Sequence, residues 1–447
     1  MSIYIQLFII CYFILYIIIN KFSKEYGIIM FWISLFIVPY PILSLSFISF
    51  LQFTTIEIII SSFFFWQNYI YRKELFCFCK KKVKPIIVLL SVYSLLILFS
   101  ETVPYKNQFY SLFNELLSFL IIIETLVYTS HSKQNKIVLL KVITYSILIN
   151  IAYSLICEAY LQVNFAGRPL YILLGMDSNE YLIDMIESSR GAFSFRMQST
   201  FGHPLSLGQY FLILVPIYFC SLSGIGNKTR IATLIFLVIS IILSGTRGAI
   251  FPLLVIVIIF LIRFSKIKLL KYSLLSFCFF TITYILLPIK IQMSINQQTS
   301  DFLTYIQFWD DRKQNKSNLS GSSVSMRLEQ FEAATNEIKN NPLFGRGRVY
   351  REYYQNQHSQ MHPKLLGYES FILLILVEQG WIGLLFFIII TFSMYQIFRK
   401  RTNNVTILRL IFIAYILSTL ITGIRPYTFL ILGLTASILI NSKNIKK

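Results

Sequence analysis

Apolar runs long enough to cross a lipid bilayer recur along most of the chain, and they restrict the possible folds more than any other feature. Each crossing needs about 20 apolar residues in a helix, because the lipid core offers no hydrogen-bond partners to the backbone. Hydrophobic residues make up 56% of the 447 residues and charged residues 13%, whereas soluble domains carry about 25% charged residues. The sequence therefore predicts an all-α fold, a polytopic membrane helical bundle.

Twelve or thirteen transmembrane helices are expected, because some of the apolar runs are short or run together. The candidate spans are residues 3–19, 28–51, 54–71, 85–100, 110–129, 137–160, 205–222, 231–243, 249–262, 272–289, 368–398, 407–422 and 428–440. Pro39 and Pro41 are expected to break the second run into two half-passes, since proline removes a helical hydrogen bond.

Basic loops alternate with non-basic loops along the chain, and this alternation predicts the orientation of the bundle. Cytoplasmic loops of membrane proteins carry an excess of Lys and Arg. Residues 80–84, 399–401 and 443–447 are such basic blocks, so the C-terminus is expected in the cytoplasm. The external loops are then residues 101–108, 161–203, 244–248, 292–367 and 424–426. Because orientation explains most of the net charge of +20, nucleic acid is not an expected partner.

Five segments follow from this topology. They are the N-terminal transmembrane helices (1–160), a smaller external loop (161–204), the central transmembrane helices (205–290), a large external loop with amphipathic helices (291–367) and the C-terminal transmembrane helices (368–447). In the large loop, Leu328, Phe331, Ala334 and Ile338 have helical spacing. This spacing predicts an amphipathic helix over the external mouth of the bundle.

Arginines in the external loops are not needed for orientation, so they are candidates for substrate binding. Arg196 stands just before a span, Arg247 lies in a turn between two spans, and Arg327 begins the expected loop helix. A guanidinium group binds phosphoryl oxygens in bidentate fashion and stays charged at any working pH. The three side chains are therefore expected near one outer cavity, where they would bind a pyrophosphate.

Glu369, at the start of the span that leaves the large loop, is the candidate catalytic base. Transfer of a glycosyl group to a sugar hydroxyl requires a group that accepts the hydroxyl proton. The further candidates for substrate binding are His203, Arg346, Arg348 and Arg425.

Structural interpretations stand beside these functional ones. Arg247 could be an anchor that reaches the membrane surface, Arg196 could contact lipid head groups, and Glu369 could pair with a neighbouring arginine. His203 precedes a proline, which is more typical of the start of a span than of a catalytic base.

No metal or organic cofactor is expected, because the chain has no phosphate-binding loop, dinucleotide fingerprint or zinc-ligand spacing. Asp177, Glu180, Asp184 and Glu187 are spaced like one face of a short helix. That pattern is more typical of a solvated acidic face than of a cation site. The six cysteines are scattered and predict free thiols.

Four short motifs stand in order between about residues 190 and 383. They are Phe-Arg-Met-Gln-Ser-Thr-Phe-Gly-His-Pro-Leu-Ser-Leu-Gly; Ile-Leu-Ser-Gly-Thr-Arg-Gly-Ala; Ser-Met-Arg-Leu-Glu-Gln-Phe-Glu-Ala-Ala followed by Asn-Asn-Pro-Leu-Phe-Gly-Arg-Gly; and Glu-Ser-Phe-Ile-Leu-Leu-Ile-Leu-Val-Glu-Gln-Gly-Trp-Ile-Gly. In order, spacing and topology this stretch resembles the O-antigen polymerase and O-antigen ligase superfamily of bacterial membrane glycosyltransferases.

The resemblance implies a multi-span fold whose large external loop covers a cavity, and a reaction on undecaprenyl-pyrophosphate-linked glycans without metal or nucleotide. By motif position, Arg196, Arg247 and Arg327 match family arginines associated with the lipid pyrophosphate. Ligases typically carry a His-Asn pair where this chain has Glu369-Ser370, which favours a polymerase. Membrane lipids, a flippase and a chain-length regulator are the partners that the resemblance suggests.

The sequence is therefore interpreted as a metal-independent, inverting polymerase of the bacterial cytoplasmic membrane. It would join lipid-linked repeat units of a surface polysaccharide, O-antigen or capsule, at the outer face. The alternatives are a ligase that moves finished glycan to a lipid or protein acceptor, a transporter or flippase, and a non-catalytic assembly scaffold. Transporters tend to show internal repeats and polar mid-bilayer helices, whereas polar residues here collect in the external loops.

Overall fold

The computed structural model describes residues 3–48, 51–79, 84–99, 102–161, 163–174, 196–220, 224–263, 324–357, 370–402 and 404–440. Within these residues almost all secondary structure is helical. The strands of this part form one short antiparallel pair, β1 (Ser46–Ile48) and β2 (Leu51–Gln52). The expected all-α fold is confirmed.

The helices divide into an earlier and a later group along the chain. The earlier group is α1 (Ile3–Phe22), α2 (Tyr26–Ile37), α3 (Tyr40–Leu43), α4 (Phe53–Gln67), α5 (Tyr69–Phe78), α6 (Lys84–Leu95), α7 (Tyr105–His131), α8 (Lys133–Tyr153) and α9 (Arg168–Leu173). The later group is α11 (Pro204–Leu214), α12 (Asn227–Leu243), α13 (Arg247–Arg263), α17 (Val324–Asn340), α18 (Tyr350–Gln357), α19 (Phe371–Arg399), α20 (Val405–Thr422) and α21 (Thr428–Ile438).

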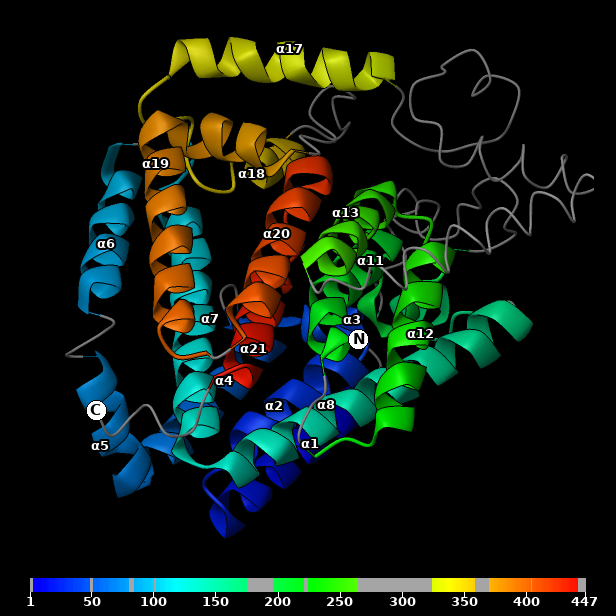
Figure 1. The fold of residues 1–447 in the computed structure, drawn as a ribbon. Coiled ribbons are helices and arrows are strands. Elements are labelled where there is room, and N and C mark those ends of the chain that lie inside the picture. The colour runs from blue at the N-terminus through cyan, green and yellow to red at the C-terminus, as the bar shows by residue number, and fades with distance from the viewer. Residues whose placement is uncertain are drawn as a thin grey trace, which may run out of the picture.

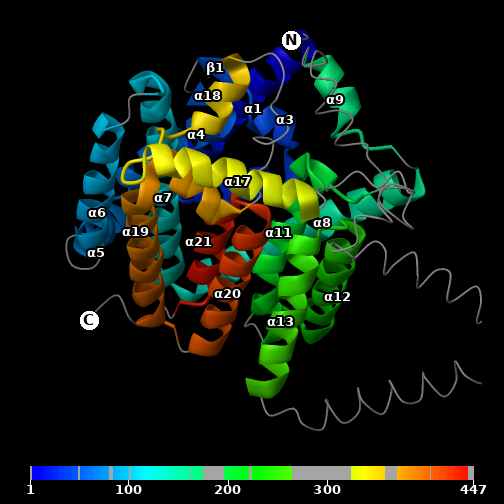
Figure 2. The ribbon, with the colours of Figure 1, turned by 90° about the horizontal axis from the view of Figure 1, so that it is seen from above.

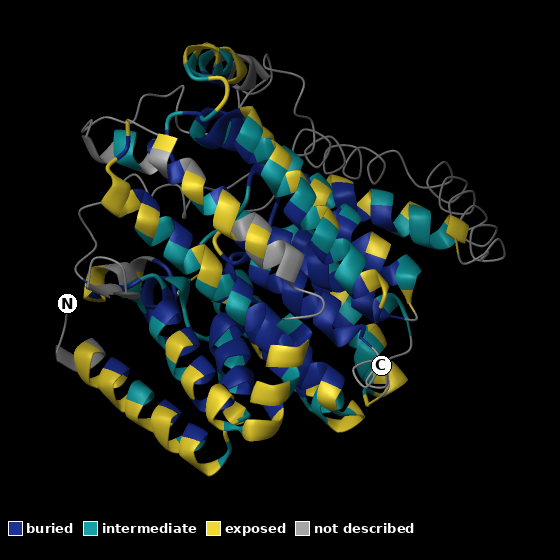
Figure 3. Ribbon diagram, turned by 90° about the vertical axis from the view of Figure 1, so that its left-hand side faces the viewer, coloured by how far each residue is buried: buried dark blue, intermediate teal, exposed yellow. Residues whose placement is uncertain are grey.

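Four of the described helices are long and apolar enough to cross a membrane. They are α7, α8 with its continuation to Tyr160, α19 and α20, and shorter apolar helices such as α2, α4, α11 and α21 pack among them. Figure 3 shows buried residues in the interior and exposed residues along the outer helices. Large apolar side chains such as Phe8 and Ile14 on α1 are about half exposed, as expected of a surface that faces lipid. The protein is a polytopic membrane protein; the expected span at residues 272–289 lies outside the described residues.

The expected second span, residues 28–51, is not one continuous helix. Helix α2 ends at Ile37, and Val38 is extended with a ψ of 130° because it precedes Pro39. The break predicted from Pro39 and Pro41 is confirmed. The prediction of a second half-pass is wrong, because the chain continues as the single turn of α3 and the β1–β2 pair.

Successive helices place their connecting loops at two opposite ends of the bundle (Figure 1). One end, which we call the loop end, holds the starts of α7, α11, α13, α19 and α21. The other, which we call the basic end, holds the connection from α7 to α8 and the end of α21, where Lys136 Nζ donates to the carbonyl of Ile440 over 3.0 Å. Which end faces the cytoplasm stays a prediction from the charge pattern.

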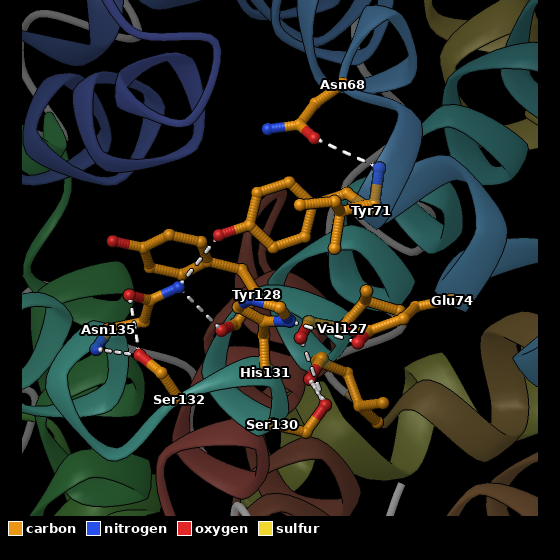
Figure 4. A network of polar contacts seen from close by, with 11 residues as sticks. Asn68, Tyr71, Glu74, Val127, Tyr128, Ser130, His131, Ser132 and Asn135 are labelled. Atoms are coloured by element: carbon orange, nitrogen blue, oxygen red, sulfur yellow. Dashed lines mark hydrogen bonds and ion pairs between the residues drawn. The ribbon is translucent and has the colours of Figure 1, made fainter. Parts of the chain in front are cut away.

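At the basic end, a network of polar side chains joins α5, α7 and α8 (Figure 4). Nδ1 of His131 lies 3.0 Å from Oε1 of Glu74. Asn135 donates to the hydroxyl of Tyr71 over 3.0 Å, and the Ser132 hydroxyl accepts from the N–H of Asn135 at the first turn of α8. These contacts fix the tight connection between two membrane helices.

Helix α17 lies across the loop end, with its C-terminal part over α19 and its other part running toward α13 (Figures 1 and 2). The expected loop helix is present as α17, but its buried face is rotated from the predicted apolar stripe. Gln330 and Ala334 are buried and Ile338 packs against the same cluster, whereas Phe331 is 54% exposed. The prediction for Phe331 is wrong because α17 packs on α19 through one narrow face. The side chain of Leu328 lies outside the described residues.

Candidate functional site

Arg196 is fixed against the turn that leads into α13. Its Nε donates to the carbonyl of Ser244 over 3.2 Å, and the N–H of Met197 donates to the carbonyl of Leu243 over 3.0 Å. Both carbonyls belong to the end of α12, and only 8% of Arg196 is exposed. Arg196 therefore lies beside the turn that carries Arg247.

Arg247 is the first residue of α13 and is half-buried. The hydroxyl of Thr246 donates to the carbonyl of Pro204 over 3.0 Å, which joins this turn to the start of α11. On the other side, Gly248 packs so closely against α20 that a Cβ at this position would overlap the side chain of Thr422. The start of α13 thus lies between the start of α11 and the end of α20.

Gln209 on α11 fixes the position of Arg425. Its Nε2 donates to the carbonyl of Gly423 over 2.9 Å, and its Oε1 accepts from the N–H of Arg425 over 3.2 Å. The same oxygen accepts from the hydroxyl of Thr428, the first residue of α21. This buried amide therefore joins the turn between α20 and α21 to α11, as does the hydroxyl of Tyr210, which accepts from the N–H of Tyr427 over 3.1 Å.

Arg196, Arg247 and Arg425 thus share the loop end, and we call them the arginine cluster. Helices α11, α13 and α21 all begin at this end. A helix N-terminus carries about half a positive charge and is a ready-made site for anions. Three arginines and three helix N-termini together make this end of the bundle electropositive, so it is suited to an anionic ligand.

His203 lies at the same end, where it caps α11. Its Nδ1 accepts a hydrogen bond of 3.0 Å from the N–H of Leu205, which otherwise has no helical partner. His203 thus stands at the start of an apolar helix, as predicted, and the entry of this helix into the membrane stays a prediction. A contact between His203 and substrate stays a prediction.

A second feature of the loop end is the break in α19 at Gly380. Its φ of 66° and ψ of −168° lie far from helical values, and a positive φ favours glycine. Four backbone hydrogen bonds join the break to the preceding loop. Two N–H groups of the loop donate to α19: that of Arg346 to the carbonyl of Val377 and that of Gly347 to the carbonyl of Glu378, both over 2.8 Å. Two N–H groups of α19 donate to the loop: that of Trp381 to the carbonyl of Pro342 over 2.9 Å and that of Ile382 to the carbonyl of Leu343 over 3.2 Å. The loop therefore supplies partners for the backbone groups that the break leaves without helical ones.

Arg346 and Arg348 lie in this loop, and both contact carboxylates. Nε of Arg346 donates to Oε2 of Glu337 on α17 over 2.7 Å. Nη1 of Arg348 lies 2.7 Å from Oε2 of Glu115 on α7, and only 4% of the Arg348 side chain is exposed. Burial alone would lower the pKa of Arg348, but Glu115 and Tyr93 raise it above its ordinary value. Both cations hold the loop on the bundle, and their contact with substrate stays a prediction.

The two remaining candidates are Arg327 and Glu369, whose side chains the structure does not describe. Arg327 belongs to the first turn of α17, as expected, and its side chain lies outside the described residues. Glu369 also lies outside them; the first described residue of this segment is Ser370, the N-cap of α19. The acidic residues 177–187 are likewise not among those described.

Two buried polar residues at the loop end were not singled out from the sequence. Glu158 lies in a π-helical stretch after α8, and its two oxygens accept from the N–H groups of Gln198, over 3.1 Å, and Ser199, over 2.8 Å. The other is Gln209, described above. An ionisable residue within the apolar run 137–160 was a usable signal for Glu158, because such residues are rare in membrane helices and usually functional.

Residues 232–388 match the model of a family described as O-antigen ligase. Over this part of the chain the protein is similar to the O-antigen polymerase and ligase superfamily, in agreement with the resemblance of its motifs. The match and the membrane helices support a membrane glycosyltransferase-like enzyme of the bacterial inner membrane, with O-antigen ligase- or polymerase-type function in general. The match includes Arg247, α17 and the break in α19, whereas Arg196 and Arg425 lie outside it. No curated protein matches the chain.

Proposed function

We propose that this protein is a polysaccharide polymerase of the O-antigen polymerase and ligase superfamily. It joins undecaprenyl-pyrophosphate-linked repeat units of a surface polysaccharide at the outer face of the cytoplasmic membrane. The observation that supports this most is the arginine cluster beside three helix N-termini, because helix N-termini and guanidinium groups both bind phosphate oxygens.

In the proposed reaction, the growing chain is the donor and the next lipid-linked repeat unit is the acceptor. The acceptor hydroxyl oxygen forms a bond to the anomeric carbon of the donor while the bond from that carbon to the pyrophosphate oxygen breaks. Undecaprenyl pyrophosphate leaves with the electron pair, and the hydroxyl proton passes to Glu369. Inversion at the anomeric carbon follows from this single displacement.

The arginine cluster lowers the activation free energy of glycosyl transfer by stabilising the charge that develops on the leaving pyrophosphate. Arg247 and Arg327 are the residues that we assign to this role, with Arg196 and Arg425 as further contacts to the lipid pyrophosphate. Guanidinium groups supply the charge that a divalent cation supplies in other phosphoryl-group sites, so the proposed reaction needs no metal.

Polymerase is favoured over ligase by the Glu369-Ser370 pair, which stands where ligases typically carry His-Asn. A ligase that transfers finished glycan to a lipid or protein acceptor is the second candidate. Breaks in membrane helices are typical of transporters, and among the described helices α19 has such a break at Gly380. That break is filled by the backbone of a loop rather than left open as an ion site, which argues for anchoring of the loop.

The test uses purified full-length protein in detergent with lipid-linked repeat units. A polymerase makes a ladder of products on the lipid carrier, and both Glu369→Gln and Arg247→Ala should remove it. Glu74→Gln at the basic end is the matched control and should keep the ladder. Full chain growth by Glu369→Gln would exclude this residue as the base. Single-step transfer to an added acceptor without a ladder would identify a ligase, and movement of intact substrate across vesicles a transporter.

A further inference from the structure

Glu115 lies on the inward face of α7, yet it is half exposed. Gln108, Leu112 and Phe119, which share this face of the helix by their spacing, are all buried, whereas the Glu115 side chain is 54% exposed. At 1.5 Å per residue, Glu115 lies about 15 Å along α7 from its first residue. Ionisable side chains at such a depth avoid lipid and face the interior or a hydrated cavity. The space that Glu115 contacts is therefore inside the bundle.

The neighbours of Glu115 are buried polar side chains from four different segments. The guanidinium carbon of Arg348 lies 4.6 Å from the centre of the Tyr93 ring, and the Tyr93 hydroxyl donates to Oε1 of Gln379 beside the break in α19. Tyr415 on α20 is close enough to Glu115 for an electrostatic interaction. We call these five residues the Glu115 cluster.

Tyr415 is the member that points most directly to a ligand. It is 1% exposed, and its hydroxyl has no hydrogen-bond partner among the described residues. A buried hydroxyl without a partner is destabilising by about 1–3 kcal/mol, so such groups are rarely kept without a use. A ligand that reaches the exposed side of Glu115 would offer Tyr415 the missing partner.

The charges of the cluster define the chemistry of that ligand. Arg348 and Glu115 lie 2.7 Å apart and neutralise each other, so neither an anion nor a cation is favoured. Oε2 of Glu115 faces Arg348, which leaves Oε1 as an acceptor, while the Tyr415 hydroxyl can both donate and accept. Sugar hydroxyls have this mixed character and no charge.

We propose that the Glu115 cluster is a sugar-binding subsite, in which Glu115 and Tyr415 hydrogen-bond hydroxyl groups of the lipid-linked glycan. The proposal rests on the proposed function and specifies where the sugar part of the substrate lies. Helix α20 connects the two sites: Tyr415 lies about 10 Å along the helix from Thr422, which touches the start of α13 at Gly248. A glycan whose pyrophosphate lies at the arginine cluster thus needs only a few sugar units to reach Glu115.

The experiment compares two probes on purified full-length protein in detergent. One probe is undecaprenyl pyrophosphate without sugars, and the other is the lipid-linked repeat unit from the bacterium that makes the protein. We expect Glu115→Gln and Tyr415→Phe each to weaken binding of the repeat unit about tenfold and to leave undecaprenyl pyrophosphate binding unchanged. Tyr415→Phe is the more decisive variant, because it should not lower the melting temperature.

Matched controls come from the basic end of the bundle. Glu74→Gln removes a carboxylate that pairs with His131, and Tyr218→Phe removes a buried hydroxyl that contacts Thr144. Both should bind the two probes like the wild-type protein. Unchanged binding of the repeat unit by Tyr415→Phe, or equal losses of both probes in Glu115→Gln, would overturn the subsite. Failure of the wild-type protein to bind undecaprenyl pyrophosphate, with sugar-dependent binding retained, would instead refute the proposed function and leave the subsite standing.

Discussion

The side-chain oxygen of Gln209 accepts a hydrogen bond of 3.2 Å from the backbone N–H of Arg425, which lies 216 residues further along the chain. The same amide donates to the carbonyl of Gly423 over 2.9 Å. Gln209 of α11 therefore helps to position the turn between α20 and α21, which carries Arg425, the third member of the arginine cluster.

Gln209→Ala should lower the free energy of unfolding by about 1–3 kcal/mol, because the buried carbonyl of Gly423 loses its donor and the N–H of Arg425 keeps only the hydroxyl of Thr428. The turn that carries Arg425 should shift, so that affinity for undecaprenyl pyrophosphate falls about tenfold. Thermal unfolding and equilibrium binding in detergent measure the two effects. Thr144→Val, which removes a buried contact of 2.9 Å to Tyr218, should lower stability alone. Equal losses of affinity in the two variants would contradict the prediction.

Glu158→Gln should disturb the segment that carries Arg196. The amide keeps one acceptor oxygen, so one of the N–H groups of Gln198 and Ser199 loses its partner, at a cost of about 1–3 kcal/mol. We expect about tenfold weaker binding of undecaprenyl pyrophosphate, measured by calorimetry. Glu124→Gln is the control, because Glu124 is a buried carboxylate of α7 that accepts from Ser62 and Trp66. It should leave binding unchanged, and a similar loss there would remove the assigned role of Glu158.

Gly380→Ala should disrupt the backbone hydrogen bonds that join the loop at residues 342–347 to α19. The new Cβ would overlap the carbonyl of Leu343, and the φ of 66° is unfavourable for alanine. Together these effects should cost at least about 3 kcal/mol. Limited proteolysis should then cut the variant within residues 341–349, and it should leave this segment of the wild-type protein intact. Gly226→Ala, at a position with open space, should behave like the wild-type protein; equal protection in Gly380→Ala would show that the joint is not needed.

Chain extension should persist in excess EDTA, because the arginine cluster supplies the positive charge that the leaving pyrophosphate requires. The measurement is the length distribution of lipid-linked products with and without chelator. In parallel, Arg247→Lys should keep the charge but lose bidentate geometry, which we expect to lower the rate about tenfold or more. Loss of the ladder in EDTA, with recovery on addition of Mg²⁺, would contradict the metal-independent reaction.

Local patterns in the sequence were sufficient for several elements. Pro39 and Pro41 predicted the break after α2, and the proline after His203 predicted the start of α11, because proline acts through the backbone next to it. Contacts between distant segments were not accessible in this way. Glu158 contacts Ser199, and Glu115 contacts Arg348. The distance between such residues along the chain does not predict their distance in space.

The rotation of the buried face of α17 illustrates the same limit. Helical spacing predicted an amphipathic helix but chose Phe331 for the buried face, where the structure has Gln330. Periodicity identifies a helix, whereas the packing partner, here α19, decides which side is covered.

The sequence by itself determined that the chain forms membrane helices, where most of them start and end, and which superfamily it resembles. These properties depend on hydrophobicity, proline and short motifs, all of which act over a few turns of the chain. Only the tertiary structure decided that the start of α13 contacts the start of α11, that Gln209 binds the turn of Arg425, and that Arg348 contacts Glu115. These contacts depend on how α11 and α20 pack, because helix packing determines which distant loops lie next to each other.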